Sequence, residues 1–113
     1  MQKQALLAAV LVSGALAFAT GPVFAGMNPH VEEAIEHAEE AVEHGGMGHA
    51  DAIVKHAGAA LGHAQAAQKE VKSPHLDEGV HELQEAVTHG KAGHAEIATK
   101  HAESAVMHLK EVH

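Results

Sequence analysis

The sequence repeats itself at an interval of 45 residues. When residues 28–68 are aligned with residues 73–113, 16 of the 41 pairs are identical. The identical pairs include Pro29 with Pro74, a match that the Ala-, His- and Glu-rich composition does not explain. A duplication of this length predicts one supersecondary unit that is built twice and packed against its own copy. We therefore divide the chain into tandem copies at residues 28–72 and 73–113.

Each copy carries the signals of a helical hairpin. Asn28 and Ser73 are good N-cap residues, and each precedes a Pro, which is favoured at the first helical position. Apolar residues then recur at intervals of three and four, the spacing of one buried helix face, before a glycine-rich turn. Second helices are expected over His49–Val71 and His94–Val112. Short connections make neighbouring helices antiparallel, so the predicted fold is all-α, an antiparallel up-down-up-down four-helix bundle of two duplicated hairpins.

Two glycines interrupt the second helix of the first copy. Gly58 and Gly62 either weaken that helix by about 1 kcal/mol each relative to Ala, or allow another helix to pack closely against it. The sequence leaves both interpretations open.

Residues 1–25 are predicted to be a cleavable signal peptide. A short segment containing Lys3 precedes an apolar run over Ala5–Ala19, and small residues favour cleavage after Ala25, with a second choice after Ala19. The alternative is a membrane-anchoring helix, but the run is shorter than the roughly 20 residues that a span needs. The cleaved protein is therefore expected to be exported and to make no membrane contact.

The remaining residues, 26–113, are acidic, helix-prone and poor in large apolar side chains. They contain all 13 His, all 15 Asp and Glu, six Lys and no Arg, a formal charge of −9 with neutral His. Phosphate binding needs clustered cations, so nucleic acid is not an expected partner. The absence of Cys excludes disulfides, thiolate metal sites and Cys nucleophiles. With 17 Ala but only 15 Val, Ile and Leu, this single domain is expected to have a thin core.

Histidines form stripes along the predicted helices. Six of the twelve intervals between successive His residues are seven residues long, so each series drifts by only about 20° per step. At 3.6 residues per turn the stripes lie roughly 80–100° from the apolar faces, at the seam where a neighbouring helix packs. Thirteen imidazoles on such edges predict metal ligation rather than solvated surface positions. The candidate ligands are His30, His37, His44, His49, His56, His63, His75, His81, His89, His94, His101, His108 and His113, supported by Glu33, Glu40 and Glu85.

One stripe cannot surround an ion, because its His residues stand about 10.5 Å apart along the helix axis. Further ligands must come from a carboxylate four residues away or from a second stripe, which faces the first either within a hairpin or across hairpins, depending on bundle handedness. Within hairpins the facing pairs are His44 with His49, His37 with His56, His30 with His63, His89 with His94, Glu82 with His101 and His75 with His108. The turn pairs, with Glu40 and Glu85 as third donors, are expected to be the tightest sites, because a short connection leaves little closure entropy to oppose them.

The donor set also predicts the ions. Nitrogen and oxygen ligands without thiolate suit borderline divalent ions, and the Irving–Williams order ranks Cu(II) above Ni(II), Zn(II) and Co(II). Only Met27, Met47 and Met107 follow the predicted leader, so a dedicated Cu(I) site is not expected. Several divalent ions per chain are the expected partners.

The recurrent His-Ala-Glu motif carries a family resemblance. Together with the leader and the lack of Cys, residues 37–39, 94–96 and 101–103 make the chain similar to the bacterial periplasmic small metal-binding protein family. The similarity extends over essentially all of residues 26–113. The resemblance implies a monomeric helical bundle in the periplasm that binds several divalent ions, Cu(II) most notably, and buffers or sequesters them.

Two other classes of function are less well supported by the residues. Di-iron enzymes built on helical bundles need Glu-x-x-His motifs on two helices, but only Glu78 with His81 matches here. No Ser or Cys nucleophile motif and no phosphate-binding glycine loop is present, so an enzyme is not expected. The alternative to metal binding is a metal-independent, pH-responsive helical binding or scaffold protein, because protonation of 13 His would move the charge from −9 toward +4.

Overall fold

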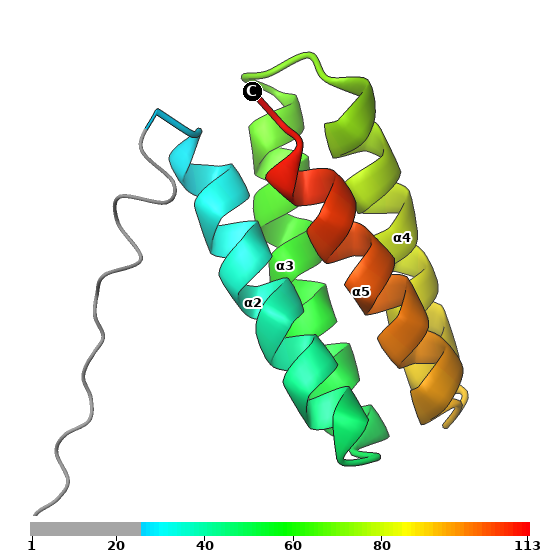
Figure 1. Cartoon of the computed structure of the whole chain (residues 1–113). Helices are drawn as coiled ribbons and strands as arrows, with labels where there is room; N and C mark the ends of the chain where they lie inside the picture. Colours follow the sequence, from blue (N-terminus) through cyan, green and yellow to red (C-terminus); the bar gives the residue numbers. More distant parts are fainter. Residues whose placement is uncertain (1–25) are drawn as a thin grey trace, which may run out of the picture.

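A computed structural model describes residues 26–113, which form four helices (Figure 1). The helices are α2 (Pro29–Gly46), α3 (Ala50–Gln68), α4 (Pro74–Lys91) and α5 (Ala95–Lys110). Helix α2 packs along α3 and α4 packs along α5, while contacts of α3 with α4 and of α2 with α5 close a four-cornered bundle. The predicted antiparallel four-helix bundle is thus confirmed over these residues. The predicted signal peptide, residues 1–25, lies outside the part of the chain that the structure describes.

The helix starts follow the capping residues that the sequence offers. The Asn28 side chain accepts hydrogen bonds from the backbone N–H groups of His30, at 2.8 Å, and Val31, at 3.4 Å. Ser73 Oγ accepts from the N–H of Leu76 at 3.3 Å at the same place in the second copy. These contacts satisfy N–H groups that have no partner within the helix. Both hairpins therefore begin at the same end of the bundle, and both of their turns lie at the other end (Figure 1).

The second helix of each hairpin ends before the predicted position. Helix α3 ends at Gln68 and α5 at Lys110, whereas the sequence predicted Val71 and Val112. In α3 the last turn tightens, with Lys69 N–H donating to Ala66 O and Glu70 N–H to Ala67 O, and further on the residue that precedes Pro74 is disfavoured in helical conformation. Ser73 accordingly has φ −154° and ψ 123°, and the chain leaves the helix before it. Val71 and Val112 nevertheless still pack against the core.

The core is assembled largely from alanines. Its largest fully buried side chains are Ile35, Ile53, Leu76, Leu83, Leu109 and Val31. Four larger apolar residues of the helices are only partly buried and pack against this core: Val42, Leu61, Val87 and Val106. No buried polar or charged residue occurs within residues 26–113. The histidines are therefore excluded from the core, and metal ligands must lie along its edges.

Glycines play opposite roles in α3 and α4. A Cβ atom added to Gly79 would lie 2.8 Å from Leu109 Cδ2, and one added to Gly90 would lie 2.8 Å from Val54 Cγ2. Both are buried positions where a neighbouring helix approaches closely. Around Gly58 and Gly62, by contrast, an added Cβ would meet no atom within 4 Å. Close packing does not explain these two residues, so the interpretation that they weaken α3 is the one that the structure supports.

A few polar contacts join the helices outside the core. Lys110 Nζ in α5 lies 3.0 Å from Glu39 Oε2 in α2, and Gln68 Nε2 donates to Asp77 Oδ1 at 2.9 Å between α3 and α4. Within the described region, no helix has the length and apolar character required to cross a bilayer.

Candidate metal-binding site

The histidine stripes meet within each hairpin. We call the α2–α3 edge the first seam, formed by His30, His37, His44, His49, His56 and His63. The second seam is the α4–α5 edge, formed by His75, Glu82, His89, His94, His101 and His108. The sequence left open whether stripes meet within or across hairpins. In the bundle they meet within hairpins. Because α2–α3 and α4–α5 are opposite edges of the four-cornered bundle, the two seams lie on opposite sides.

The first seam is an unbroken ladder of imidazole rings. Successive ring centroids lie 5.0–6.4 Å apart in the order His30, His63, His37, His56, His44 and His49. At its open end, His30 Nδ1 lies 3.4 Å from His63 Nδ1. The rings of His44 and His56 are almost parallel, at 6°. The predicted approaches of His30 to His63 and of His37 to His56 are confirmed.

Carboxylates complete two groups of three possible ligands in this seam. Glu33 joins His37 and His63, with ligand atoms within 4.8 Å of one another. Glu40 joins His37 and His56, its Oε1 atom lying 3.2 Å and 3.1 Å from their Nδ1 atoms. The sequence assigned Glu40 to the turn pair with His44 instead. The aligned Glu85 of the second copy does lie beside its turn histidine, His89. There Glu82 replaces His37, so the presence of His37 accounts for the different partner of Glu40.

Two ring nitrogens of the first seam lack the partner that a buried polar atom normally has. The Nδ1 atoms of His37 and His44 are buried and make no hydrogen bond within the described residues. For His37, Glu40 is near enough but not aligned for a hydrogen bond. Unpaired polar atoms of this kind are costly in a folded protein and call for a missing partner. A neutral imidazole nitrogen with a free lone pair is a metal ligand, so this seam fits a bound ion.

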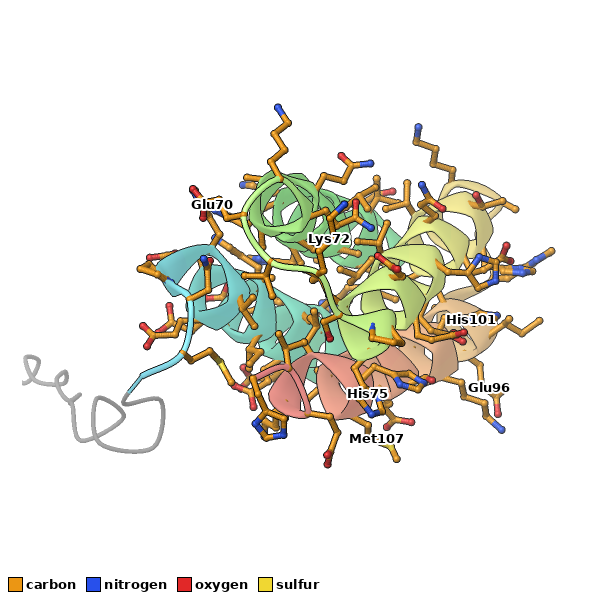
Figure 2. All side chains as sticks on the ribbon, turned by 90° about the horizontal axis from the view of Figure 1, so that it is seen from above. Glu70, Lys72, His75, Glu96, His101 and Met107 are labelled. Atoms are coloured by element: carbon orange, nitrogen blue, oxygen red, sulfur yellow. The ribbon has the colours of Figure 1, made fainter. Side chains whose placement is uncertain are left out.

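The second seam repeats much of this geometry through the duplication. Its end pair, His75 and His108, has Nδ1 atoms 3.3 Å apart, and Figure 2 shows His75 and His101 on the α4–α5 side of the bundle. The rings of His89 and His101 lie 5.3 Å apart at 10°, like their counterparts in the first seam. Glu85, His89 and His101 form the third group of possible ligands. Glu85 Oε1 lies 3.6 Å from His89 Nε2, as the sequence predicted from their spacing.

The two seams differ at one position. Glu82 stands where the first copy has His37, and its Oε1 atom lies 2.7 Å from His101 Nδ1. The predicted approach of Glu82 to His101 is confirmed. Glu82 was not among the candidate ligands predicted from the sequence, although its alignment with His37 at an interval of 45 residues places it in the seam.

The turn pairs have close rings but differ in their carboxylates: within residues 26–113, Glu85 lies beside His89, whereas no carboxylate pairs with His44. His44 and His49 have ring centroids 6.2 Å apart, and His89 and His94 have centroids 6.0 Å apart. His49 and His94 are exposed, and neither belongs to a group of three possible ligands. Their rank as the tightest sites stays a prediction.

Two candidate ligands lie apart from both seams. His81 and His113 are exposed, and neither makes a ring contact or a carboxylate pair within residues 26–113. His81 aligns with Glu36 of the first copy, one residue before the seam position. A shift of one residue rotates a side chain by about 100° around the helix axis, which takes His81 out of the seam.

The first seam lies beside an acidic helix face. Partial burial, reinforced by the negative charge of Glu33, raises the pKa of the Glu36 carboxyl above its usual range. Helix α2 carries six Glu residues and no Lys. Such a one-signed surface attracts cations to the ligands beside it.

Comparison with known proteins agrees with this chemistry. The model of a family described as "small metal-binding protein" matches residues 2–112. A search of curated proteins gives no significant match.

Proposed function

The chain belongs to the small metal-binding protein family, and on that premise we propose that its two histidine seams bind several divalent transition-metal ions. The observation that carries the proposal is that the buried Nδ1 atoms of His37 and His44 make no hydrogen bond within the described residues. These atoms lie in a ladder of rings flanked by carboxylates, where an ion would supply the missing partner. Three groups of His and Glu residues offer three donors each.

The donor atoms favour Cu(II). Imidazole nitrogen and carboxylate oxygen suit borderline ions, for which the Irving–Williams order places Cu(II) above Ni(II), Zn(II) and Co(II). Cu(II) is therefore the preferred cargo, and the other three ions bind more weakly. The seams act by binding alone, with no catalytic role.

The exposure of the ligands favours buffering or sequestration of exchangeable ions. The side chains of His37, His56 and His101 are 31%, 22% and 31% exposed, so ions can enter from solvent without a large opening of the bundle. Sites of this kind, several to a chain, can take up and release ions as the free concentration changes. With the predicted leader, this activity belongs in the periplasm, and the cleaved chain works as a monomer.

A calorimetric titration tests the proposal. The protein without metal is titrated with Cu(II) and, separately, with Zn(II) at pH 7.5, beside a variant carrying His37→Ala and His56→Ala. We expect several Cu(II) ions per chain, tighter binding of Cu(II) than of Zn(II), and fewer ions in the variant. The matched control is His81→Ala with His113→Ala, which removes two imidazoles outside the seams and should leave the tight phases unchanged. One ion or none per chain, or tighter binding of Zn(II), would contradict the proposal.

Export is tested separately. The full chain is expressed in a bacterium with a periplasm, and the mass of the periplasmic product is measured. We expect a chain that begins at Gly26, and a product that stays in the cytoplasm at full length would refute the periplasmic assignment.

A further inference from the structure

The two seams consist of the same residues at aligned positions, except at one position. The end pairs are nearly superimposable in geometry, with Nδ1 atoms 3.4 Å apart in the first seam and 3.3 Å apart in the second, and ring planes inclined by 33° in both. The turn pairs also agree, at 6.2 Å and 35° against 6.0 Å and 36°. Against this background, the exchange of His37 for Glu82 stands out as the difference within the seams.

In the first seam, His37 connects the two halves of the ladder. Its ring lies 5.6 Å from that of His63 on one side and 6.4 Å from that of His56 on the other. His37 belongs to both groups of possible ligands, one completed by Glu33 and the other by Glu40. A neutral imidazole has one nitrogen with a free lone pair, so His37 can serve only one ion at a time. When an ion occupies one of these groups, a second ion cannot be fully coordinated at the other. Because both groups contain His37, the two ion positions are adjacent.

In the second seam, Glu82 removes that connection. No ring contact joins the end pair of His75 and His108 to the rings of His89 and His101 within the described helices. Glu82 instead binds His101, and its side chain is only 19% exposed. An ionised carboxylate accepts hydrogen bonds but cannot donate them, so Nδ1 of His101 must be the donor. The Nε2 atom is left with the free lone pair, and the ring is held in one orientation, as carboxylates commonly hold metal-ligating histidines.

We propose that this one position gives the seams different behaviour toward their ions. The first seam holds an ion that is shared between two overlapping groups and moves along the ladder through His37, whereas Glu82 makes the group of Glu85, His89 and His101 a fixed site. This inference rests on the proposed function, since it presumes that the seams bind ions. Glu82 is a positioning residue in this scheme, and His37 is a shared ligand.

Nuclear magnetic resonance of the imidazole nitrogens distinguishes the two behaviours. The chain is labelled with ¹⁵N at histidine and titrated at pH 7.5 with Zn(II), which is diamagnetic, up to one ion per chain. In the first seam we expect Zn(II) to shift the signals of both His56 and His63, although these two residues belong to different groups, because one ion divides its time between the groups through His37. In the second we expect shifts at His89 and His101 only, with His75 and His108 at their metal-free positions. The end pair of the second seam is the internal control, because exchange of Zn(II) through free solution would shift it as well.

Reciprocal variants assign the difference to the one position. Glu82→His should extend the shifts in the second seam to His108, and His37→Glu should confine the shifts in the first seam to one group. Glu82→Gln keeps an acceptor for His101 Nδ1 and should leave the shifts confined to His89 and His101, whereas Glu82→Ala removes the acceptor and should reduce the shift of His101. If either exchanged variant fails to fold, as judged by circular dichroism, the comparison of Glu82→Gln with Glu82→Ala still decides the role of the hydrogen bond.

The outcomes separate this inference from the proposed function. Zn(II) that shifts no imidazole signal would overturn both. Zn(II) that shifts signals in both seams, but shifts only one of His56 and His63 or also shifts His75 and His108, would overturn only the difference between the seams. Unchanged shifts in Glu82→His and in Glu82→Ala would show that this position does not control the difference.

Discussion

At the scale of single residues, the side chains that surround a carboxylate decide which histidine it supports. Spacing along the sequence identified Glu33, Glu40 and Glu85 as donors one turn from a histidine, and all three do lie in groups of possible ligands. Spacing alone could not assign Glu40 to its partners. Its partner His56 comes from another helix, and its partner His37 lies three residues before it, whereas the aligned Glu85 lies beside His89, four residues after it. Composition and period thus find the residues of a seam, whereas their partnerships depend on tertiary geometry.

Glu40 should therefore matter to the centre of the first seam. Replacing Glu40 by Gln removes the charge that lies beside both His37 and His56, and we expect Cu(II) affinity at this group to fall by about tenfold or more. Glu43→Gln, on an exposed face of the same helix, is the matched control. Competition titration against a Cu(II) chelator measures both, and equal losses in the two variants would refute a local role for Glu40.

The turn pairs provide a second test of individual residues. Because a short connection joins His44 to His49, little closure entropy opposes their convergence, and His44 Nδ1 lacks a partner. We expect the double replacement of His44 and His49 by Ala to remove the tightest phase of a Cu(II) titration. A larger loss from replacing His56 and His63 would show that the tightest site lies in the middle of the seam.

The carboxyl of Glu36 carries a pH-dependent cost to folding. Its pKa is raised by partial burial and by Glu33, so the folded state favours the protonated form. When the pKa of a carboxyl is higher in the folded state, its contribution to stability is fully present below the unfolded-state pKa. That contribution is lost as pH rises through the folded-state pKa. We expect Glu36→Gln to raise the stability of the metal-free protein slightly at pH 7 and to have less effect at pH 4. Urea unfolding at the two pH values measures this, and a destabilised variant at pH 7 would contradict it.

At the scale of helices, the sequence predicted where the two hairpins begin but placed the ends of α3 and α5 too late. The N-terminal caps Asn28 and Ser73 act through residues two or three positions away, so the sequence contains the whole interaction. Helix α3 ends at Gln68, six residues before Pro74, in a tightened last turn that the spacing of residues did not predict. The pairing of stripes within hairpins follows from the handedness of the bundle, which no local pattern encodes.

The glycines of α3 and α4 predict opposite effects of the same substitution. Gly58→Ala and Gly62→Ala should each stabilise the protein by up to about 1 kcal/mol, because Ala has the higher helix propensity and nothing lies within 4 Å of the added methyl group. Gly79→Ala should destabilise it, because the methyl group would lie against Leu109 in a core without spare space. Chemical unfolding of the three variants compares them. Stabilisation by Gly79→Ala would mean that α4 and α5 can move apart freely.

At the scale of the whole molecule, metal binding should be a major source of stability. The core contains many alanines and no aromatic ring, so burial contributes little per residue and the metal-free bundle should be marginal. An ion held between two helices binds the folded state better than the unfolded one. It adds about 2.7 kcal/mol at a hundredfold excess over its Kd.

Acid should remove that stabilisation. The ligands must be neutral imidazoles, and a bound ion lowers their affinity for protons, so the gain is present above about pH 6.5, the ordinary imidazole value, and is lost below it. We expect Cu(II) to raise the Tm at pH 7.5 and to have little effect at pH 5, as followed by far-ultraviolet circular dichroism. A Tm that Cu(II) leaves unchanged at pH 7.5, or raises equally at pH 5, would refute this coupling.

The placement of the seams on opposite edges of the bundle has a consequence for how the molecule meets a metal-bearing surface. With the proposed function, each chain has two chelating strips, one facing each way. A surface that carries immobilised ions would then hold the protein by either strip, while the strip on the far side stays open to ions in solution. An adsorbed layer of such chains would therefore still capture dissolved ions.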